Sequence, residues 1–177
     1  MNIVLLTGSA HRSGTTAALA REFQRGAEDA GHEVFRFDAA FRDVHPCIGC
    51  DRCRREGVCT FAADDMKRLN PHLLAAEAVV FVSPIYYFDL SAQLKAVIDR
   101  FYANDDALHG GKRALLLTAM ADEDLGAAEG ADATFRSICA YLQWENAGIL
   151  NAAGASTAED LTEEDLRRAY DLGKTLK

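Results

Sequence analysis

Residues 1–16 read MNIVLLTGSAHRSGTT, an apolar run that passes through a glycine into small hydroxyl residues. The run from Ile3 to Thr7 does not alternate polar and apolar residues, so we expect a strand that is buried on both faces of a sheet. Gly8 to Thr16 then leads into residues with helical spacing. A loop between a strand and a helix N-terminus directs backbone N–H groups and the helix dipole at an anion. The stretch therefore predicts a strand–loop–helix unit with a phosphate site.

Four further apolar runs follow along the chain, and segments with helical spacing separate them. The runs cover residues 34–37, 78–82, 114–118 and 147–150. In segments 94–101 and 135–142 apolar residues recur at positions i, i+3, i+4 and i+7, which is typical of one helix face. Thr162 and Asp165 match a capping box and mark the start of a last helix. The sequence thus predicts a doubly wound α/β fold with a five-stranded parallel sheet in a three-layer α/β/α arrangement.

Composition and charge describe one acidic globular domain. The chain has 177 residues, of which 49% are hydrophobic and 26% are charged, and its formal net charge is -8. This length suffices for one buried core, so we expect a single domain over residues 1–177. The negative charge argues against binding to nucleic acids or anionic membranes, which need a basic surface. The N-terminal apolar run is too short for a signal sequence or a membrane span, and we expect a cytoplasmic protein.

The loop after the first strand carries groups that suit a single phosphate monoester. Its hydroxyl donors are Ser9, Ser13, Thr15 and Thr16. His11 or Arg12 can add a positive charge. The loop lacks the lysine and spacing of a nucleoside triphosphate loop, and it lacks the glycine spacing of a dinucleotide fingerprint. A plain helix cap made of serine and threonine is the alternative interpretation.

A second loop contains three consecutive aromatic residues. Residues 83–91 read SPIYYFDLS, and Pro84 ends the preceding strand. The aromatic residues are Tyr86, Tyr87 and Phe88. At a loop tip they cannot all enter one core, so they indicate a flat ligand or a partner surface. A phosphate grip on one loop and an aromatic platform on another match the two ends of FMN. Small residues from Thr118 onward would let the backbone approach the edge of its ring.

The two loops together resemble those of the flavodoxin-like NAD(P)H-dependent FMN reductase family. Residues 8–16 are similar to the family's G-S-P-R-x-x-G-N-T phosphate loop, and residues 83–100 are similar to its second flavin loop and following helix. The likeness extends over roughly residues 1–155. It implies a flavodoxin-like fold, FMN as the cofactor and NAD(P)H or a similar electron donor. It also implies a homodimer or homotetramer in which a neighbouring chain helps to close the flavin pocket.

The resemblance also assigns site residues. It implies that the phosphate is held by Ser9, His11, Thr15 and Thr16. It implies that the isoalloxazine ring lies along Pro84, Ile85, Tyr86, Tyr87 and Phe88. At four positions the chain departs from the family: Ala10 replaces Pro, His11 replaces Arg, Thr15 replaces Asn and Phe88 replaces Gly. A neutral His11 would weaken the charge partner of the phosphate, and Phe88 would narrow the space above the ring.

A long insertion at about residues 38–65 carries four of the five cysteines. They form the pattern C-x2-C-x2-C-x5-C, which consists of Cys47, Cys50, Cys53 and Cys59. This spacing fits a [4Fe–4S] cluster and resembles that of the iron–sulfur flavoproteins in the same superfamily. The arginines at positions 52, 54 and 55 would offset the negative charge of a thiolate-bound cluster. Zinc on four thiolates and free or redox-active thiols are the open alternatives.

These features lead to three functional hypotheses. The first is an FMN-dependent oxidoreductase that passes electrons from NAD(P)H or a similar donor to a small acceptor, such as a quinone, a nitro compound or a free flavin. The cofactor carries this chemistry, so we expect no catalytic side chain. The second is an iron–sulfur flavoprotein that exchanges electrons with protein partners. The third is an FMN-binding redox sensor.

Overall fold

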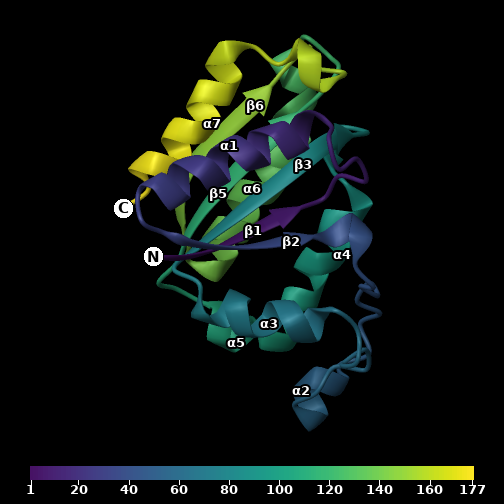
Figure 1. Cartoon of the computed structure of the whole chain (residues 1–177). Coiled ribbons are helices and arrows are strands. Elements are labelled where there is room, and N and C mark those ends of the chain that lie inside the picture. Colours follow the sequence, from purple (N-terminus) through teal and green to yellow (C-terminus); the bar gives the residue numbers. More distant parts are fainter.

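The computed structural model describes residues 1–177, which form six β-strands and seven α-helices. The strands are β1 (Asn2–Thr7), β2 (Glu33–Asp38), β3 (Ala78–Tyr86), β4 (Asp89–Leu90), β5 (Arg113–Ala119) and β6 (Glu145–Ala152). The helices are α1 (Thr15–Asp29), α2 (Arg52–Glu56), α3 (Met66–Ala75), α4 (Ala92–Asp99), α5 (Asp105–Leu108), α6 (Glu129–Leu142) and α7 (Glu163–Thr175). Both chain termini lie at the same end of the molecule (Figure 1).

Five of the strands form a parallel sheet in the order β2-β1-β3-β5-β6. β1 lies between β2 and β3: Ile3 pairs with Val34 of β2 on one side and with Ala78 of β3 on the other. The chain first moves from β1 outward to β2 and then crosses back to β3, so the strand order reverses between β1 and β3. The predicted doubly wound five-stranded parallel sheet is confirmed, and each predicted apolar run lies within one of these strands.

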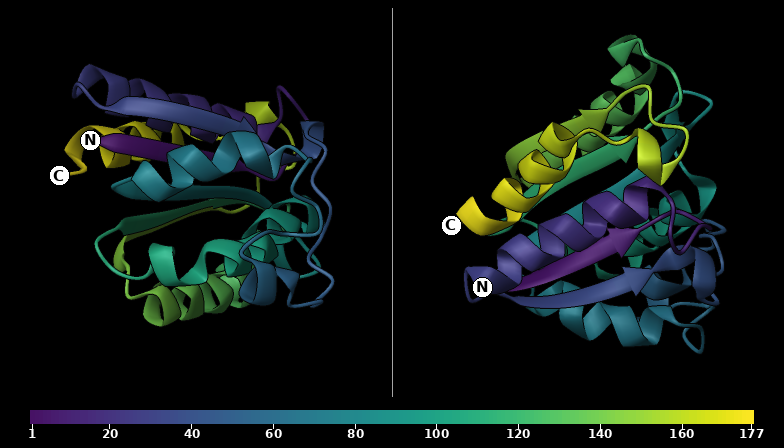
Figure 2. Two further views of the ribbon diagram at one scale, coloured as in Figure 1. Left: turned by 90° about the horizontal axis from the view of Figure 1, so that it is seen from below. Right: turned by 45° about the horizontal axis from the view of Figure 1, so that its top comes forward.

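Each face of the sheet has its own hydrophobic core. Val4 and Leu6 of β1 pack in one core with residues of α3, α4 and α6. Ile3 and Leu5 pack in the other core with residues of α1 and α7. Figure 2 shows the sheet between these two helix layers. Because alternate residues of a strand enter opposite cores, the strands read as continuous apolar runs, and the three-layer prediction is confirmed.

Helices α1 and α7 cross at very short range on their face of the sheet. A Cβ atom on Gly26 would lie 2.0 Å from the carbonyl oxygen of Tyr170. A Cβ atom on Gly173 would lie 2.1 Å from the carbonyl oxygen of Phe23. Any side chain at either glycine would therefore collide with the backbone of the other helix.

Four elements were not predicted from the sequence: β4 and the helices α2, α3 and α5. β4 pairs antiparallel with the last residues of β3, Ile85 and Tyr86. Its two residues are too few to produce a periodic pattern. Helix α3 buries Met66, Leu69 and Leu73, but Pro71 lies within it. A proline inside a helical pattern weakens the sequence signal for a helix.

Between β2 and α3 the chain leaves the sheet. Residues 43–51 have no regular secondary structure, and the short helix α2 follows them. In Figure 1 α2 lies at the tip of this excursion, away from the sheet. None of the helices in the protein combines the length and apolar character needed to cross a bilayer.

Candidate functional site

A cleft of about 640 Å³ opens at the carboxyl edge of the sheet. Its lining comes from the β1–α1 loop, the end of β3, residues 119–121 at the end of β5 and residues 155–159 after β6. It lies where the strand order reverses between β1 and β3, which is the position at which doubly wound sheets bind ligands. The volume falls within the range of roughly 300–1,000 Å³ that is typical of small-molecule sites.

The β1–α1 loop presents a helix N-terminus to this cleft. Helix α1 follows Gly14, and no side chain caps its first turn. The first turn also contains no acidic residue. Ser9 Oγ accepts a hydrogen bond from the backbone N–H of His11 at 3.0 Å, which holds the loop in a tight turn. Uncapped N–H groups, the helix dipole and nearby hydroxyls together favour a bound anion.

Most of the predicted flavin residues line the cleft. They are Ser9, His11, Ser13, Thr15, Pro84, Ile85 and Tyr86. Thr16 is buried and lines a smaller neighbouring cavity instead. Thr118 is also buried, and its hydroxyl donates to Asn151 Oδ1 at 2.6 Å rather than facing the cleft. Tyr87 is 100% exposed and Phe88 is 63% exposed, and neither contributes to the lining in this chain.

Arg12 lies outside the cleft, in the neighbouring cavity of about 140 Å³. Its guanidinium carbon is 3.7 Å from the ring centroid of Phe41. Asp38 lines the same cavity. Burial acts to raise the pKa of Asp38, but the hydrogen bond that it accepts from Thr7, its ion pair with an arginine on β2 and the charge of Arg12 lower it overall. Because Arg12 is engaged here, His11 is the only basic side chain on the cleft lining.

Tyr87 and Phe88, which we call the aromatic tip, form a two-residue hairpin turn between β3 and β4. Tyr87 and Phe88 have φ angles of 48° and 67°. Two-residue turns with two positive φ angles usually contain Asn and Gly, because a Cβ atom is strained there. Helix α6 packs against the turn: a Cβ atom on Gly130 would lie 2.2 Å from the carbonyl oxygen of Phe88. Thr134 Oγ1 of α6 also donates to Asp89 Oδ2 at 3.2 Å.

Two serines that were not among the predicted site residues join the two loops. Ser91 Oγ donates to the carbonyl oxygen of Gly8 at 2.9 Å, and Ser91 N donates to Ser83 Oγ at 2.9 Å. Both serines are fully buried. Ser91 is also the N-cap of α4, and it accepts a bond from the N–H of Leu94 at 3.4 Å. A serine directly before a helical pattern is a cap signal, but its partner Gly8 lies too far away in sequence to be inferred.

All four clustered cysteines line one further cavity. The thiols of Cys47, Cys50, Cys53 and Cys59 are free and line one small hollow beside the end of α4. Cys47 and Cys50 are exposed, whereas Cys53 and Cys59 are partly buried. A hydrogen bond with the Thr60 hydroxyl, 3.2 Å from Cys50 Sγ, lowers the pKa of the Cys50 thiol. No three His, Cys, Asp or Glu side chains are grouped closely enough to hold one metal ion.

Two sets of contacts fasten the cysteine-bearing segment to the domain. At the outer set, Arg54 donates to Asp105 at 2.9 Å and to Asp106 at 3.0 Å. The Tyr102 hydroxyl donates to Asp51 at 3.0 Å. Arg54, which the sequence placed as a charge partner of a cluster, is therefore paired with carboxylates of α5.

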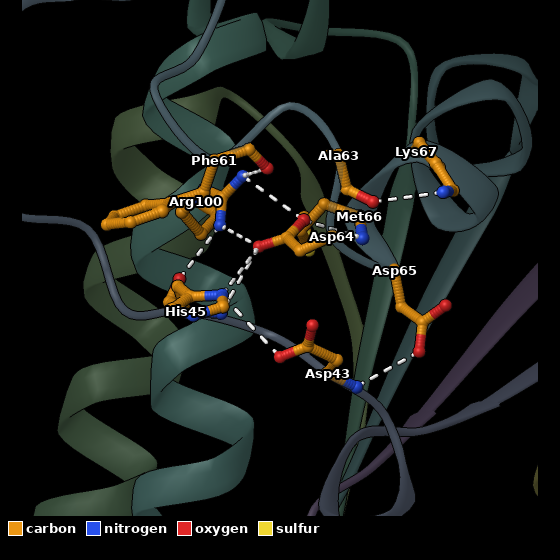
Figure 3. Close-up of polar contacts among 9 residues, drawn as sticks. All are labelled: Asp43, His45, Phe61, Ala63, Asp64, Asp65, Met66, Lys67 and Arg100. Atoms are coloured by element: carbon orange, nitrogen blue, oxygen red, sulfur yellow. Dashed lines mark hydrogen bonds and ion pairs between the residues drawn. The ribbon is translucent and has the colours of Figure 1, made fainter.

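The inner set is centred on Arg100, which directly follows α4 (Figure 3). Its Nη1 donates to the carbonyl oxygen of His45 at 2.8 Å and to Asp64 Oδ2 at 2.5 Å. Its Nη2 donates to the carbonyl oxygen of Phe61 at 3.2 Å. Burial acts to raise the pKa of Asp64, but the hydrogen bonds from Arg100 and from backbone N–H groups lower it overall. The rings of His45 and Phe61 stack with centroids 4.7 Å apart.

Several named proteins share sequence with this chain. An iron-sulfur flavoprotein of Methanocaldococcus jannaschii is 33% identical over 100 residues, which cover 56% of this chain and 51% of that protein. An FMN-dependent NADH:quinone oxidoreductase of Methylorubrum extorquens is 31% identical over 126 residues, which cover 63% of this chain and 62% of that protein. The chain thus spans about half the length of the iron-sulfur flavoproteins that it matches.

A solved structure and a family model also match this chain. The NAD(P)H:quinone oxidoreductase from Methanothermobacter marburgensis superimposes with a TM-score of 0.75 at 19% identity, over 99% of this chain and 95% of that one. At this identity the likeness shows the flavodoxin-like fold alone. The family model described as NADPH-dependent FMN reductase matches residues 1–149. This chain therefore belongs to the NADPH-dependent FMN reductase family.

Proposed function

We propose that this protein binds FMN in the cleft at the sheet edge and passes electrons from a nicotinamide donor to a small acceptor, such as a quinone. One observation carries the proposal: a single cleft has an uncapped, acid-free helix N-terminus at one end and a largely apolar wall at the other. FMN has the same two ends, a phosphate and a flat ring. When bound, it supplies the hydride and electron chemistry.

The phosphate end uses the β1–α1 loop. The N–H groups of the first turn of α1 and the hydroxyls of Ser9, Ser13 and Thr15 are the donors. His11 is the one side chain on the lining that can carry a positive charge, because no lysine or arginine lines the cleft. Each hydrogen bond to a charged phosphate is worth roughly 1.5–3 kcal/mol.

The ring end uses Pro84, Ile85 and Tyr86 of β3 together with residues 119–121. Ala119 and Met120 are buried, so this wall is both apolar and packed. Apart from His11, the only ionisable side chains on the lining are those of Tyr86 and Glu159. The protein's contribution is then to hold and orient the cofactor and to admit the acceptor, with no acid or base step assigned to a side chain.

FMN titration of the phosphate loop tests this proposal. A Ser9→Ala, Thr15→Ala double variant should bind FMN at least tenfold more weakly, since two charge-assisted hydrogen bonds are lost. Thr175→Ala removes an exposed hydroxyl from the far end of α7 and should leave FMN affinity unchanged. A wild-type protein that takes up no FMN would overturn the proposal. An unchanged FMN affinity in the double variant would show that this loop does not bind the phosphate.

We also propose that Cys47, Cys50, Cys53 and Cys59 hold a [4Fe–4S] cluster. All four thiols are free and line one cavity. In such a cluster each thiolate binds its own iron, so the thiolates need not converge on one point. Arg100 lines the same cavity, and its Nε is buried without a hydrogen-bond partner, which suits an acceptor such as sulfur. When bound, a cluster supplies one-electron transfer.

Exposure of the cysteine site favours a second candidate function, in which this site exchanges electrons with a protein partner. Cys47 and Cys50 lie at the protein surface. Iron and sulfide analysis after anaerobic reconstitution tests the cluster. Cys50→Ser should abolish iron uptake, whereas Cys139→Ala, which removes a buried core thiol, should not. Zinc in place of iron, or no metal in the wild-type protein, would exclude the cluster.

We further propose a homodimer or homotetramer in which a neighbouring chain covers the aromatic tip. The fully exposed Tyr87 and the largely exposed Phe88 and Leu125 support this proposal. Sedimentation equilibrium of the FMN-bound protein measures the assembly. Tyr87→Ser should weaken it, while Tyr141→Ser, which changes an exposed aromatic residue on α6, should leave it intact. A monomeric wild-type protein would exclude the assembly.

A further inference from the structure

One side chain holds both ends of the cysteine loop, which we define as residues 45–61. Arg100 binds the carbonyl oxygen of His45, which is two residues before the first cysteine. It also binds the carbonyl oxygen of Phe61, which is two residues after the last cysteine. These two carbonyls are the points at which the loop leaves and rejoins the domain (Figure 3).

Asp64 completes the closure of the loop. Its carboxylate pairs with Arg100 and accepts bonds from the backbone N–H groups of His45 at 3.2 Å and Met66 at 3.0 Å. The side chains of Arg100 and Asp64 are only 3% and 2% exposed. A buried ion pair of this kind is strongly disrupted when one partner is lost, because the remaining charge is stranded.

The guanidinium itself is held by a rigid element. Arg100 follows α4, whose residues Leu94 and Val97 are fully buried in the core. The Phe61 ring lies beneath the guanidinium, with Arg100 Cζ 5.6 Å from its centroid, and the ring also stacks on His45. The loop ends are therefore held by contacts with Arg100 and Asp64 and by the stacking of Phe61 on His45.

We propose that Arg100 is a positioning residue that holds the cysteine loop closed and so assembles the four-thiol cavity before metal enters. It acts through His45, Phe61 and Asp64. Arg100 also lines the cavity, and its Nε is a buried donor without a partner; hydrogen bonds to sulfur tune the reduction potential of a cluster. The proposal that Arg100 assembles the cavity depends only on the contacts of Arg100. The proposal that Arg100 tunes a reduction potential depends on the proposed cluster.

Thiol labelling of the FMN-bound, metal-free protein tests the closure of the loop. We expect Arg100→Lys to raise the labelling rates of the partly buried Cys53 and Cys59 by about tenfold, because lysine cannot bind His45, Phe61 and Asp64 together. The matched control is Lys112→Met. Lys112 is also a buried cation, and it donates to the carbonyl oxygens of Leu74 and Ala76, away from the loop. The control should leave the labelling rates of the loop cysteines unchanged.

A double variant covers the case in which Arg100→Lys does not fold, as judged by far-UV circular dichroism. Arg100→Met with Asp64→Asn removes both buried charges, so no charge is stranded. It should bind FMN and show the same rise in labelling. Wild-type labelling rates in either folded variant would overturn the proposal.

Anaerobic reconstitution with iron and sulfide separates this proposal from that of the cluster. If the wild-type protein takes up iron, we expect Arg100→Lys to take up less and to show a shifted reduction potential. If the wild-type protein takes up none, the cluster is excluded, and the labelling rates alone decide whether Arg100 holds the loop. Equal uptake and equal potential in the variant would contradict the role of Arg100 toward the metal.

Discussion

The side-chain hydroxyl of Ser91 donates a hydrogen bond to the carbonyl oxygen of Gly8 across 2.9 Å, although the two residues are 83 positions apart. Gly8 opens the loop between β1 and α1, and Ser91 follows the β3–β4 hairpin that carries Tyr87 and Phe88. A Cβ atom on Gly8 would lie 2.2 Å from Ser91 Oγ, so the contact leaves no room for a side chain at position 8. The bond therefore sets the spacing between the two ends of the proposed flavin cleft.

Removal of this link should loosen both loops. Ser91→Ala loses the cap of α4 and leaves the Gly8 carbonyl unpaired, which should lower the free energy of unfolding by about 1–3 kcal/mol. FMN affinity should also fall by about tenfold. Thr162→Ala, which removes the cap of α7 away from the cleft, should cost about 1 kcal/mol of stability and leave FMN affinity unchanged. Urea unfolding and FMN titration measure the two effects. Equal affinities in the two variants would contradict the link.

The strained hairpin gives a second prediction. Phe88 adopts a φ angle of 67°, which glycine reaches without strain. Phe88→Gly should therefore raise the free energy of unfolding relative to Phe88→Ala by up to about 1 kcal/mol, because alanine removes the ring and keeps the strain. Thermal unfolding of both variants at one FMN concentration measures the difference. Equal stabilities would show that the turn relaxes without help from glycine.

The sheet could be predicted because strands that are buried on both faces appear in the sequence as continuous apolar runs. Ile3 and Val4 enter opposite cores, so the strand that contains them has no polar position. The loop that follows β1 could be predicted for a similar reason, since its composition and its place before a helix are both local features. Thr15 and Thr16 show the limit of such reasoning. Neighbouring residues on a helix point about 100° apart, and composition does not tell which of the two faces the cleft.

The rest of the site depends on contacts that are distant in sequence. Arg100 reaches His45, Phe61 and Asp64 across separations of 55, 39 and 36 residues, which no local pattern reveals. Arg12 was a candidate for the phosphate, but the structure places it against Phe41 in another cavity. The placement of His11 on the cleft lining and of Arg12 outside it therefore required the fold.

The crossing of α1 and α7 predicts a large effect from a small substitution. Gly173→Ala places a methyl group 2.1 Å from the carbonyl oxygen of Phe23, so the helices must separate. We expect the free energy of unfolding to fall by about 1–3 kcal/mol even though alanine is the better helix former. Arg168→Ala on the exposed face of α7 should change it by less than about 0.5 kcal/mol. Denaturant unfolding with both variants decides the point. A neutral or stabilising Gly173→Ala would show that the two helices separate at little cost.

Asp38 predicts the direction of one acid-dependent contribution to stability. Hydrogen bonds from Thr7 and Arg36 hold the pKa of Asp38 below its ordinary value of 3.8 in the folded protein, despite its partial burial. A carboxyl group with a lowered folded pKa stabilises the fold at pH values above its unfolded pKa, and this stabilisation is lost as the pH falls through the folded pKa. The difference in unfolding free energy between wild type and Asp38→Asn should therefore be constant from about pH 7 to about pH 5 and shrink below the ordinary value. Urea unfolding across this range measures it, with Asp171→Asn on the exposed side of α7 as the control. A difference that stayed constant into acid would mean that Asp38 contributes through its shape and not through its charge.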